Sequence, residues 1–334
     1  MLEILGQGGT VKLIDTANED VQGHHFTLSY VWGNPKPPLM LTPATEAGLR
    51  GGLAVDSMER TYRNALVATR SLGYKHLWID IFCIFQDKSA EGKEDWNRES
   101  TSMDKVYTEG LLNISASHAS HGDVGCFTQV TEDFTAPPIC VLWAKTAGDQ
   151  PSWYSISSHY LERSQDNVQK DFEIKSPVFS RGWIVQERML APLVLHFAAE
   201  GIIWECAEGR AMQYSPHLPN HMVVSERLGP CAGSFSALNV TSSHLTTLWF
   251  RALFTYTRTN LTEPKKDKLI TVLGISKRVA KALGDTLWQG FLSPTLPYSL
   301  CWYATCRPEN RESEPCEALV NDAFPSWHFA RSNH

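Results

Sequence analysis

The sequence predicts an α/β fold in which a parallel sheet is flanked by helices, and three observations support this. Runs rich in β-branched and aromatic residues, at 24–33 and 77–85, enclose a helical pattern at 57–72. A second helical pattern at 95–107 precedes a short apolar run at 111–117. Strands that alternate with helices in this way need right-handed crossovers, which put helices on both faces of a parallel sheet.

Each element has its own signal. The strand at 24–33 ends at Gly33, where a glycine- and proline-rich cluster stops regular structure. The helix at 57–72 follows from apolar residues at helical spacing, and Gly73 stands where a left-handed C-terminal cap belongs. The run at 77–85 does not alternate, which is typical of a strand buried on both faces. The acidic start of the helix at 95–107 suits the helix dipole.

The pattern changes in the second half of the chain. We therefore predict an α/β core over residues 1–127 and a large α+β elaboration over 128–334 that packs on the core. The elaboration begins with a Pro-, Ser- and Thr-containing excursion and contains a hairpin, two helices and an irregular aromatic tail. We predict the excursion at 128–176 and the hairpin at 193–197 with 202–206. The two helices are predicted at 245–258 and 267–283, and the tail follows residue 296.

Composition limits the classes of function. The 334 residues are 43% hydrophobic and carry a formal net charge of −6 without a basic run, so nucleic acid is not expected as a partner. The N-terminus lacks the features of a signal peptide, and no apolar run reaches the ~18 residues that a membrane span needs. The eight cysteines are scattered without metal-ligand spacing, so no metal site is expected. We expect a soluble, cytoplasmic protein without a membrane span.

Asp80 is chemically out of place inside its apolar run. Burying a carboxylate costs several kcal/mol unless it is paired or hydrogen-bonded. We therefore expect Asp80 to have a structural or catalytic use. It could orient a ligand hydroxyl beyond the end of a strand, or it could form an ion pair with Arg181 or Arg188.

Several short sequence motifs follow one another along the chain between residues 26 and 327. They are Leu28 to Gly33, Leu77 to Gln86, Asp95-Trp96 with Glu99 and Met103 to Tyr107, Asn113 to Ser117, Ser180 to Trp183 with Gln186 to Arg188, Leu195 to Phe197, Trp204 to Cys206, and Pro325 to Trp327. Together they resemble the fungal heterokaryon-incompatibility (HET) domain family. That family is associated with programmed cell death after the fusion of unlike cells.

A weaker similarity to Toll/interleukin-receptor (TIR) domains implies a TIR/flavodoxin-like sheet and NAD as a substrate. In enzymatic TIR domains, a Glu that follows a Trp on a helix supports cleavage of NAD at the nicotinamide bond. Trp96 and Glu99 resemble that pair but lie three residues apart, against four in many TIR domains. Such cleavage passes through a cation-like ribose, which a carboxylate stabilises. The alternatives are an exposed helical Glu99 and a Trp96 that packs in the core.

Two further groups are candidate substrate-binding residues. Ser29, Tyr30 and Gly33 form the exit of the first strand, where backbone can approach a ligand closely. The segment from Arg181 to Arg188 concentrates two guanidiniums, an amide and a carboxylate, in a pattern that suits a pyrophosphate at a helix start. Its candidate residues are Arg181, Trp183, Gln186, Glu187 and Arg188. An internal ion-pair lattice would explain the same residues equally well.

Three functions follow from these observations. The first is a cell-death effector that hydrolyses NAD or a related nucleotide, with Glu99 and Asp80 as catalytic residues and no cofactor. The second is a non-catalytic signalling module that binds protein partners or itself. The third is an enzyme of small-molecule biosynthesis. A pocket that joins Asp80, Glu99 and Arg181 would favour an enzyme, whereas mutual pairing of these groups away from solvent would favour the module.

Overall fold

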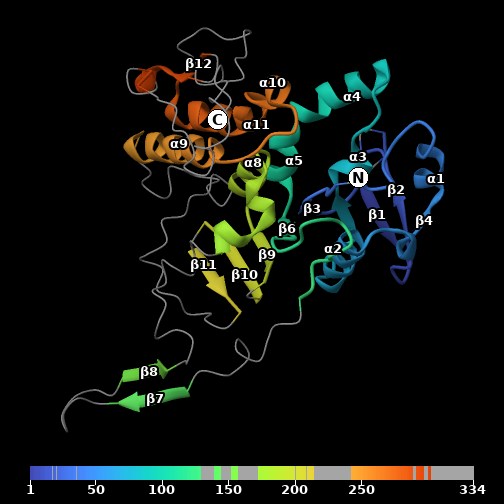
Figure 1. Cartoon of the computed structure of the whole chain (residues 1–334), viewed down its shortest axis with the longest axis horizontal. Helices are drawn as coiled ribbons and strands as arrows, with labels where there is room; N and C mark the ends of the chain where they lie inside the picture. The colour runs from blue at the N-terminus through green and yellow to red at the C-terminus, as the bar shows by residue number, and fades with distance from the viewer. Residues whose placement is uncertain are drawn as a thin grey trace, which may run out of the picture.

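A nine-stranded mixed sheet runs through the part of the chain that the structure describes (Figure 1). The structure is a computed structural model. It describes residues 1–128 apart from 17, 20 and 35, then 139–143, 152–156, 172–213 apart from 200 and 208, 242–288, 291–296 and 300–301. The strands are, in spatial order, β11 (Gly209–Met212), β10 (Gly201–Cys206), β9 (Val194–Ala198), β6 (Leu112–Ser115), β3 (His25–Ser29), β5 (His76–Trp78), β1 (Leu2–Leu5), β2 (Thr10–Leu13) and β4 (Leu53–Ala54).

The four strands at the centre of the sheet, β9, β6, β3 and β5, are mutually parallel. Ser29 pairs with Ser115, and Ser115 pairs with His196, so three strands end at the same edge. The strands outside this group are antiparallel to their neighbours. The predicted α/β class with a partly parallel sheet is confirmed.

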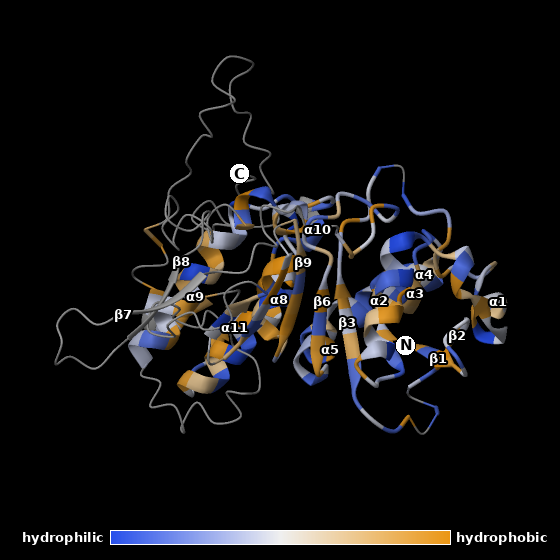
Figure 2. Cartoon of the chain, turned by 90° about the horizontal axis from the view of Figure 1, so that it is seen from below, coloured by the Kyte–Doolittle hydropathy of each residue, from blue (hydrophilic) through white to orange (hydrophobic). Residues whose placement is uncertain are grey.

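Helices cover both faces of the sheet. One face packs against α2 (Arg60–Ser71), whose Tyr62 and Leu66 join the buried side chains of β3. The other face packs against α5 (Met103–Glu109) and α8 (Ile184–Leu190). The helices α9 (Ser242–Tyr256) and α11 (Ile270–Leu283) pack on α8 and on each other, and all four share a second apolar cluster. Figure 2 shows α8, α9 and α11 on one side of β6 and β3, and α2 on the other.

Short elements complete the described residues. They are α1 (Glu46–Gly51), η1 (Val55–Ser57), α3 (Asp80–Cys83), α4 (Ala90–Ser100), η2 (Pro177–Ser180), α10 (Pro264–Asp267), η5 (Ser293–Thr295), and the strand pairs β7 (Ile139–Trp143) with β8 (Ser152–Ile156) and β12 (Leu287–Trp288) with β13 (Phe291–Leu292). No helix among the described residues is both long and apolar enough to cross a membrane.

The predicted strand at 77–85 is wrong beyond Trp78. β5 ends there, and α3 begins at Asp80. Ile81 and Phe82 in α3 are fully buried, so this short helix has the same unbroken apolar sequence that a buried strand would have. Periodicity alone does not separate the two cases. The Asp80 carboxylate accepts a hydrogen bond from the Ile81 amide at 2.7 Å, which satisfies one free N–H at the start of α3.

Two predicted helices are each interrupted. The pattern at 95–107 is split into α4 and α5 at Thr101, whose hydroxyl donates to the Asn97 and Arg98 carbonyls. Such side-chain bonds slightly destabilise and bend helices. α4 also starts earlier than predicted, after Ser89, whose hydroxyl accepts from the Gly92 amide at 2.9 Å. The pattern at 267–283 is divided between α10 and α11.

Other sequence predictions agree with the structure. The helix at 57–72 is α2, and Gly73 after it has a φ of +86°. The hairpin is β9 with β10, and the helix at 245–258 is α9. Strands β1, β2 and β4 were not predicted. Pro325 to Trp327 and most of the excursion at 128–176 lie outside the described residues, and the division at 127/128 stays a prediction.

Candidate functional site

Polar side chains gather at the carboxyl ends of the parallel strands. The chain runs from β3 to β5 on one side, and β6 lies on the other side of β3, so the strand order reverses between β3 and β6. In open α/β sheets, ligands bind beyond the carboxyl ends of the strands at this reversal. Ser29 ends β3, Ser115 ends β6, and Asp80 follows β5 closely. This edge is therefore the candidate site.

Asp80 is held by aromatic side chains from the β3 exit. The Tyr30 hydroxyl donates to Oδ1 at 2.7 Å, and the Trp32 indole N–H donates to Oδ2 at 3.1 Å. Burial, and then the neighbouring Asp80 charge, raise the pKa of Tyr30 well above its ordinary value, so the phenol stays a donor. Asp80 itself is only partly buried. Its carboxylate is thus fixed in direction while part of its surface remains accessible.

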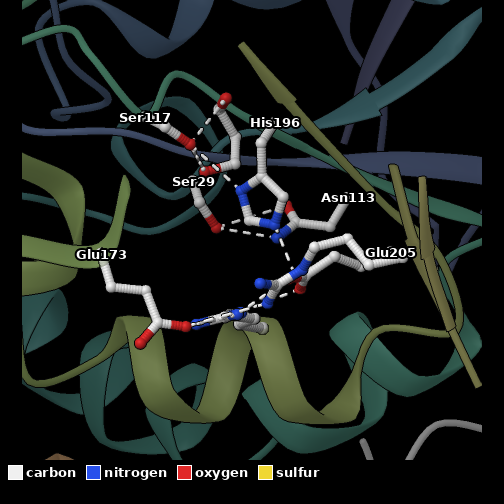
Figure 3. Close-up of polar contacts among 9 residues, drawn as sticks. Ser29, Asn113, Ser117, Glu173, His196 and Glu205 are labelled. Carbon is white, nitrogen blue, oxygen red and sulfur yellow. Dashed lines mark hydrogen bonds and ion pairs between the residues drawn. The ribbon is translucent and has the colours of Figure 1, made fainter. Parts of the chain in front are cut away.

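A second carboxylate, Glu187 of α8, lies deeper in the site. The Ser29 hydroxyl donates to it. The Ser29 hydroxyl also accepts from the side-chain amide of Asn113 on β6, as Figure 3 shows. Glu187 is only 2% exposed. Burial raises its pKa, although the Arg181 guanidinium acts in the opposite direction.

Arg181 lies beside Glu187, and the charge of Asp80 also acts on it. Its guanidinium lies 3.9 Å from Glu187, donates to the Tyr30 carbonyl, and stands 5.9 Å over the Tyr30 ring. Although burial acts to lower its pKa, Glu187 and then Asp80 raise it overall, so Arg181 stays charged. Its side chain is 22% exposed. The site therefore has a sealed inner part, Ser29 with Glu187, and an outer part, Asp80 with Arg181, that reaches the surface.

Arg188 belongs to a separate buried ion network. Its Nε and Nη2 donate to Glu205 of β10 at 2.9 and 2.8 Å, and Nη2 also bonds Glu173 at 3.0 Å. Arg210 pairs with the same Glu205, and His196 Nε2 lies 3.2 Å from it (Figure 3). The alternative of an internal ion-pair lattice thus describes Arg188.

Burial and the neighbouring charges shift the pKa values of two members of this network, Glu205 and His196. Burial alone would raise the pKa of Glu205, but Arg188 and Arg210 hold it well below the ordinary value. Burial lowers the pKa of His196 to about 4, against the opposing effect of Glu205. His196 is therefore neutral near pH 7, and its Nδ1 lies 3.0 Å from the Ser117 hydroxyl.

Gln186 and Gly33 have contacts that fix the local fold. The side-chain oxygen Oε1 of Gln186 accepts a hydrogen bond from the Gly274 backbone amide at 3.0 Å, which connects α8 to α11. Gly33 has a φ of +83°, and a Cβ there would lie 2.6 Å from the Cβ of His121. A glycine is needed at this exit because the loop that carries His121 approaches so closely.

Glu99 lies near the end of α4. Its carboxylate accepts from the Arg98 Nε at 3.1 Å, and its side chain is 29% exposed. Within the part of the chain that the structure describes, no hydrogen bond or ion pair links Glu99 to Asp80 or Arg181. Trp96, one turn earlier, meets Trp183 edge to face, with ring centroids 6.5 Å apart.

Asn113 was missed by the sequence reasoning. It is fully buried in β6 and contacts the hydroxyls of Thr27 and Ser29. An amide inside a short apolar strand is the same signal that drew attention to Asp80 and could have found it. A metal site is absent from the described residues, where no group of three His, Cys, Asp or Glu side chains could hold an ion.

Comparison with protein families finds a match that spans the candidate site. Residues 25–187 match the family model described as heterokaryon incompatibility protein (HET). Residues 25–187 of this chain are thus similar to a heterokaryon-incompatibility domain. The match begins at β3 and ends at Glu187, so it covers Ser29, Asp80 and Arg181. No curated protein and no solved structure matches the chain. The HET resemblance is confirmed, whereas the TIR-like aspect stays a prediction.

Proposed function

We propose that this HET-domain protein is a heterokaryon-incompatibility-type effector of cell death that hydrolyses NAD or a related nucleotide. The family match supports the cell-death role. One observation supports the chemistry: Asp80 and Arg181 both reach the surface at the strand reversal, while Glu187 beneath them is sealed. A carboxylate beside a guanidinium suits a ligand that carries both ribose hydroxyls and phosphates.

The proposed reaction adds water to the ribose carbon that carries nicotinamide. The bond from that carbon to the ring nitrogen breaks, neutral nicotinamide leaves, and the proton of the water is released. The ribose passes through a cation-like state that a carboxylate stabilises. We assign this role to Glu99, ribose orientation to Asp80, and the phosphate contact to Arg181. The network around Arg188 would have to break for Arg188 to hold a phosphate.

The position of Glu99 relative to Trp96 supports its assignment. Glu99 lies one helical turn after Trp96, so both side chains project from the same side of α4. Trp96 meets Trp183, which follows Arg181 by two residues. A rotation of the half-exposed Glu99 side chain away from Arg98 would turn its carboxylate toward the indoles.

A non-catalytic module is the second candidate, and a specific observation favours it. Ser29, Arg181 and Glu187 satisfy one another inside the site. Such mutual pairing holds a fold together without any ligand. In that case the cell-death role would depend on self-association or on a protein partner.

The test is nicotinamide release from NAD by concentrated purified protein, followed by chromatography. Removing one group that stabilises transition-state charge typically costs about 10²–10³-fold in rate, so we expect that loss for Glu99→Gln. Glu94→Gln is the matched control, because Glu94 is an exposed carboxylate of the same helix. Asp80→Asn and Arg181→Lys should each reduce the rate as well.

Circular dichroism should show that every variant is folded. Release that is lost in Glu99→Gln and kept in Glu94→Gln would support the hydrolase. A folded wild type that releases no nicotinamide would refute it. Light scattering over a range of protein concentrations would then test the module by its self-association.

A further inference from the structure

Lys266 of α10 lies against an aromatic ring of α4. Its ammonium Nζ is 3.1 Å from the centroid of the Trp96 ring. A lysine ammonium is strongly hydrated and is normally kept in water. Indole faces attract cations more strongly than other aromatic rings do. The contact therefore marks Trp96 as a face that binds a cation.

Two carboxylates near the contact also favour a cation. Glu263 and Asp267 flank Lys266 on its own segment, whereas the positive charge of Lys93 on α4 acts in the opposite direction. Asp267 is only 7% exposed, and its Oδ1 has no hydrogen-bond partner among the described residues. Asp267 also interacts with the indole of Trp183. An aromatic face next to a buried, incompletely satisfied carboxylate is the composition of a site for an organic cation.

Lys266 is not in an ideal environment at this place. Burial lowers the pKa of its ammonium, against the effects of Asp267 and Glu263. The residue as a whole is exposed, so it can leave without disturbing the core. α10 is a single turn that starts at a proline, and Lys266 projects from that turn.

We propose that the Trp96 face is a binding site for a flat organic cation, a pyridinium ring, and that Lys266 is an intramolecular occupant which this ligand displaces. A pyridinium can stack over the indole with its whole surface, whereas an ammonium makes a single point contact. We assign the anionic part of the same ligand to Arg181, two residues before Trp183, whose side chain is 22% exposed beside Glu187.

This inference deepens the proposed function and rests on it, because it names the form of the nucleotide that would be bound. Oxidised nicotinamide nucleotides carry a positive ring, and reduced ones carry a neutral ring. The site should therefore prefer the oxidised form. Lys266 should weaken binding, because the ligand can bind only those molecules in which Lys266 has left the ring. The apparent affinity is therefore the intrinsic affinity multiplied by the fraction of molecules with an empty site.

The experiment is a ligand-detected NMR titration with N-methylnicotinamide, a pyridinium cation, and with neutral nicotinamide as its uncharged counterpart. The proteins are the wild type, Lys266→Gln, Trp96→Leu and Trp96→Phe. Lys277→Gln is the matched control, because Lys277 is an exposed lysine of α11. Tetramethylammonium is the third probe and represents methylated ammonium groups. Binding is measured without turnover, so the result does not depend on hydrolysis.

We expect N-methylnicotinamide to bind the wild type and to bind Lys266→Gln about 3-fold to 10-fold more tightly, which corresponds to about 0.7–1.4 kcal/mol. Lys277→Gln should match the wild type. Binding should be lost in Trp96→Leu and weakened in Trp96→Phe, which keeps a smaller aromatic face. Neutral nicotinamide should bind at least several-fold more weakly.

Four results would overturn the inference. They are equal affinities of the wild type and Lys266→Gln, unchanged binding in both Trp96 variants, equal binding of neutral nicotinamide, and a preference for tetramethylammonium. If pyridinium binding fails while NAD is still hydrolysed, this inference fails and the proposed function stands. If binding behaves as expected but no nicotinamide is released, the cation site stands and the hydrolase fails.

Discussion

Replacing Glu205 by glutamine should remove the centre of the buried ion network. Glu205 is 4% exposed and accepts hydrogen bonds from Arg188 at 2.9 and 2.8 Å, while Arg210 and His196 contact the same carboxylate. Removing one partner of a buried ion pair leaves the other charge without compensation and costs about 3–5 kcal/mol. Two guanidiniums lose their buried anion here and keep the more exposed Glu173. We therefore expect a loss of unfolding free energy within that range.

Glu173→Gln is a matched control within the same network. Glu173 also bonds Arg188, at 3.0 Å, but its side chain is 36% exposed. Ion pairs that water can reach contribute about 0–1 kcal/mol. The same chemical change should therefore cost several-fold less at this position.

Equilibrium urea unfolding at pH 7, followed by circular dichroism, measures both variants. If Glu205→Gln does not fold, Arg210→Gln provides a milder test, because Glu205 then keeps its two bonds to Arg188. We expect its cost to lie between those of the two Glu variants. Equal small losses in Glu205→Gln and Glu173→Gln would refute the reasoning, since burial would then not decide the energy of these pairs.

Three further predictions concern single positions. The folded-state pKa of His196 is about 4, below its ordinary value of 6.5, so the folded state binds fewer protons than the unfolded state between these pH values. The free energy of unfolding should therefore fall by about 3 kcal/mol as the pH drops from 6.5 to 4. His196→Gln should flatten the urea midpoint against pH over this range. Gly33→Ala should lower the free energy of unfolding by about 1–3 kcal/mol more than Gly73→Ala does. Both glycines have positive φ, but only Gly33 has a neighbour at 2.6 Å from the added Cβ. Equal melting temperatures of the two variants would contradict this. Gly274→Ala should destabilise α11, because the added Cβ would lie 2.4 Å from a side-chain atom of α5. This loss should appear although alanine favours helices over glycine by about 1 kcal/mol. Gly48→Ala in α1, where the added Cβ has open space, should leave the melting temperature unchanged or raise it.

The sequence predicted the strand and helix alternation of the core, because local spacing and breakers carry that information. It also pointed to Asp80 through the mismatch between a carboxylate and its apolar neighbours. It placed Asp80 in a strand, however, because Ile81 and Phe82 are buried in α3 as completely as strand residues would be. The hydrogen bond from Tyr30, fifty positions earlier, comes only with the tertiary fold.

By itself, the sequence determined the α/β class, the α2 helix with its Gly73 cap, the β9–β10 hairpin and the HET motifs. These features depend on residues that are close in the chain. Only the tertiary structure decided which charged groups meet. Arg181 and Arg188 both lie in one short motif, yet Arg181 faces Glu187 and Tyr30 while Arg188 is bound by Glu205 from a distant strand. The physical reason is that the energy of a charge depends on its partners and its burial, and both are set by strand order and helix packing rather than by sequence spacing.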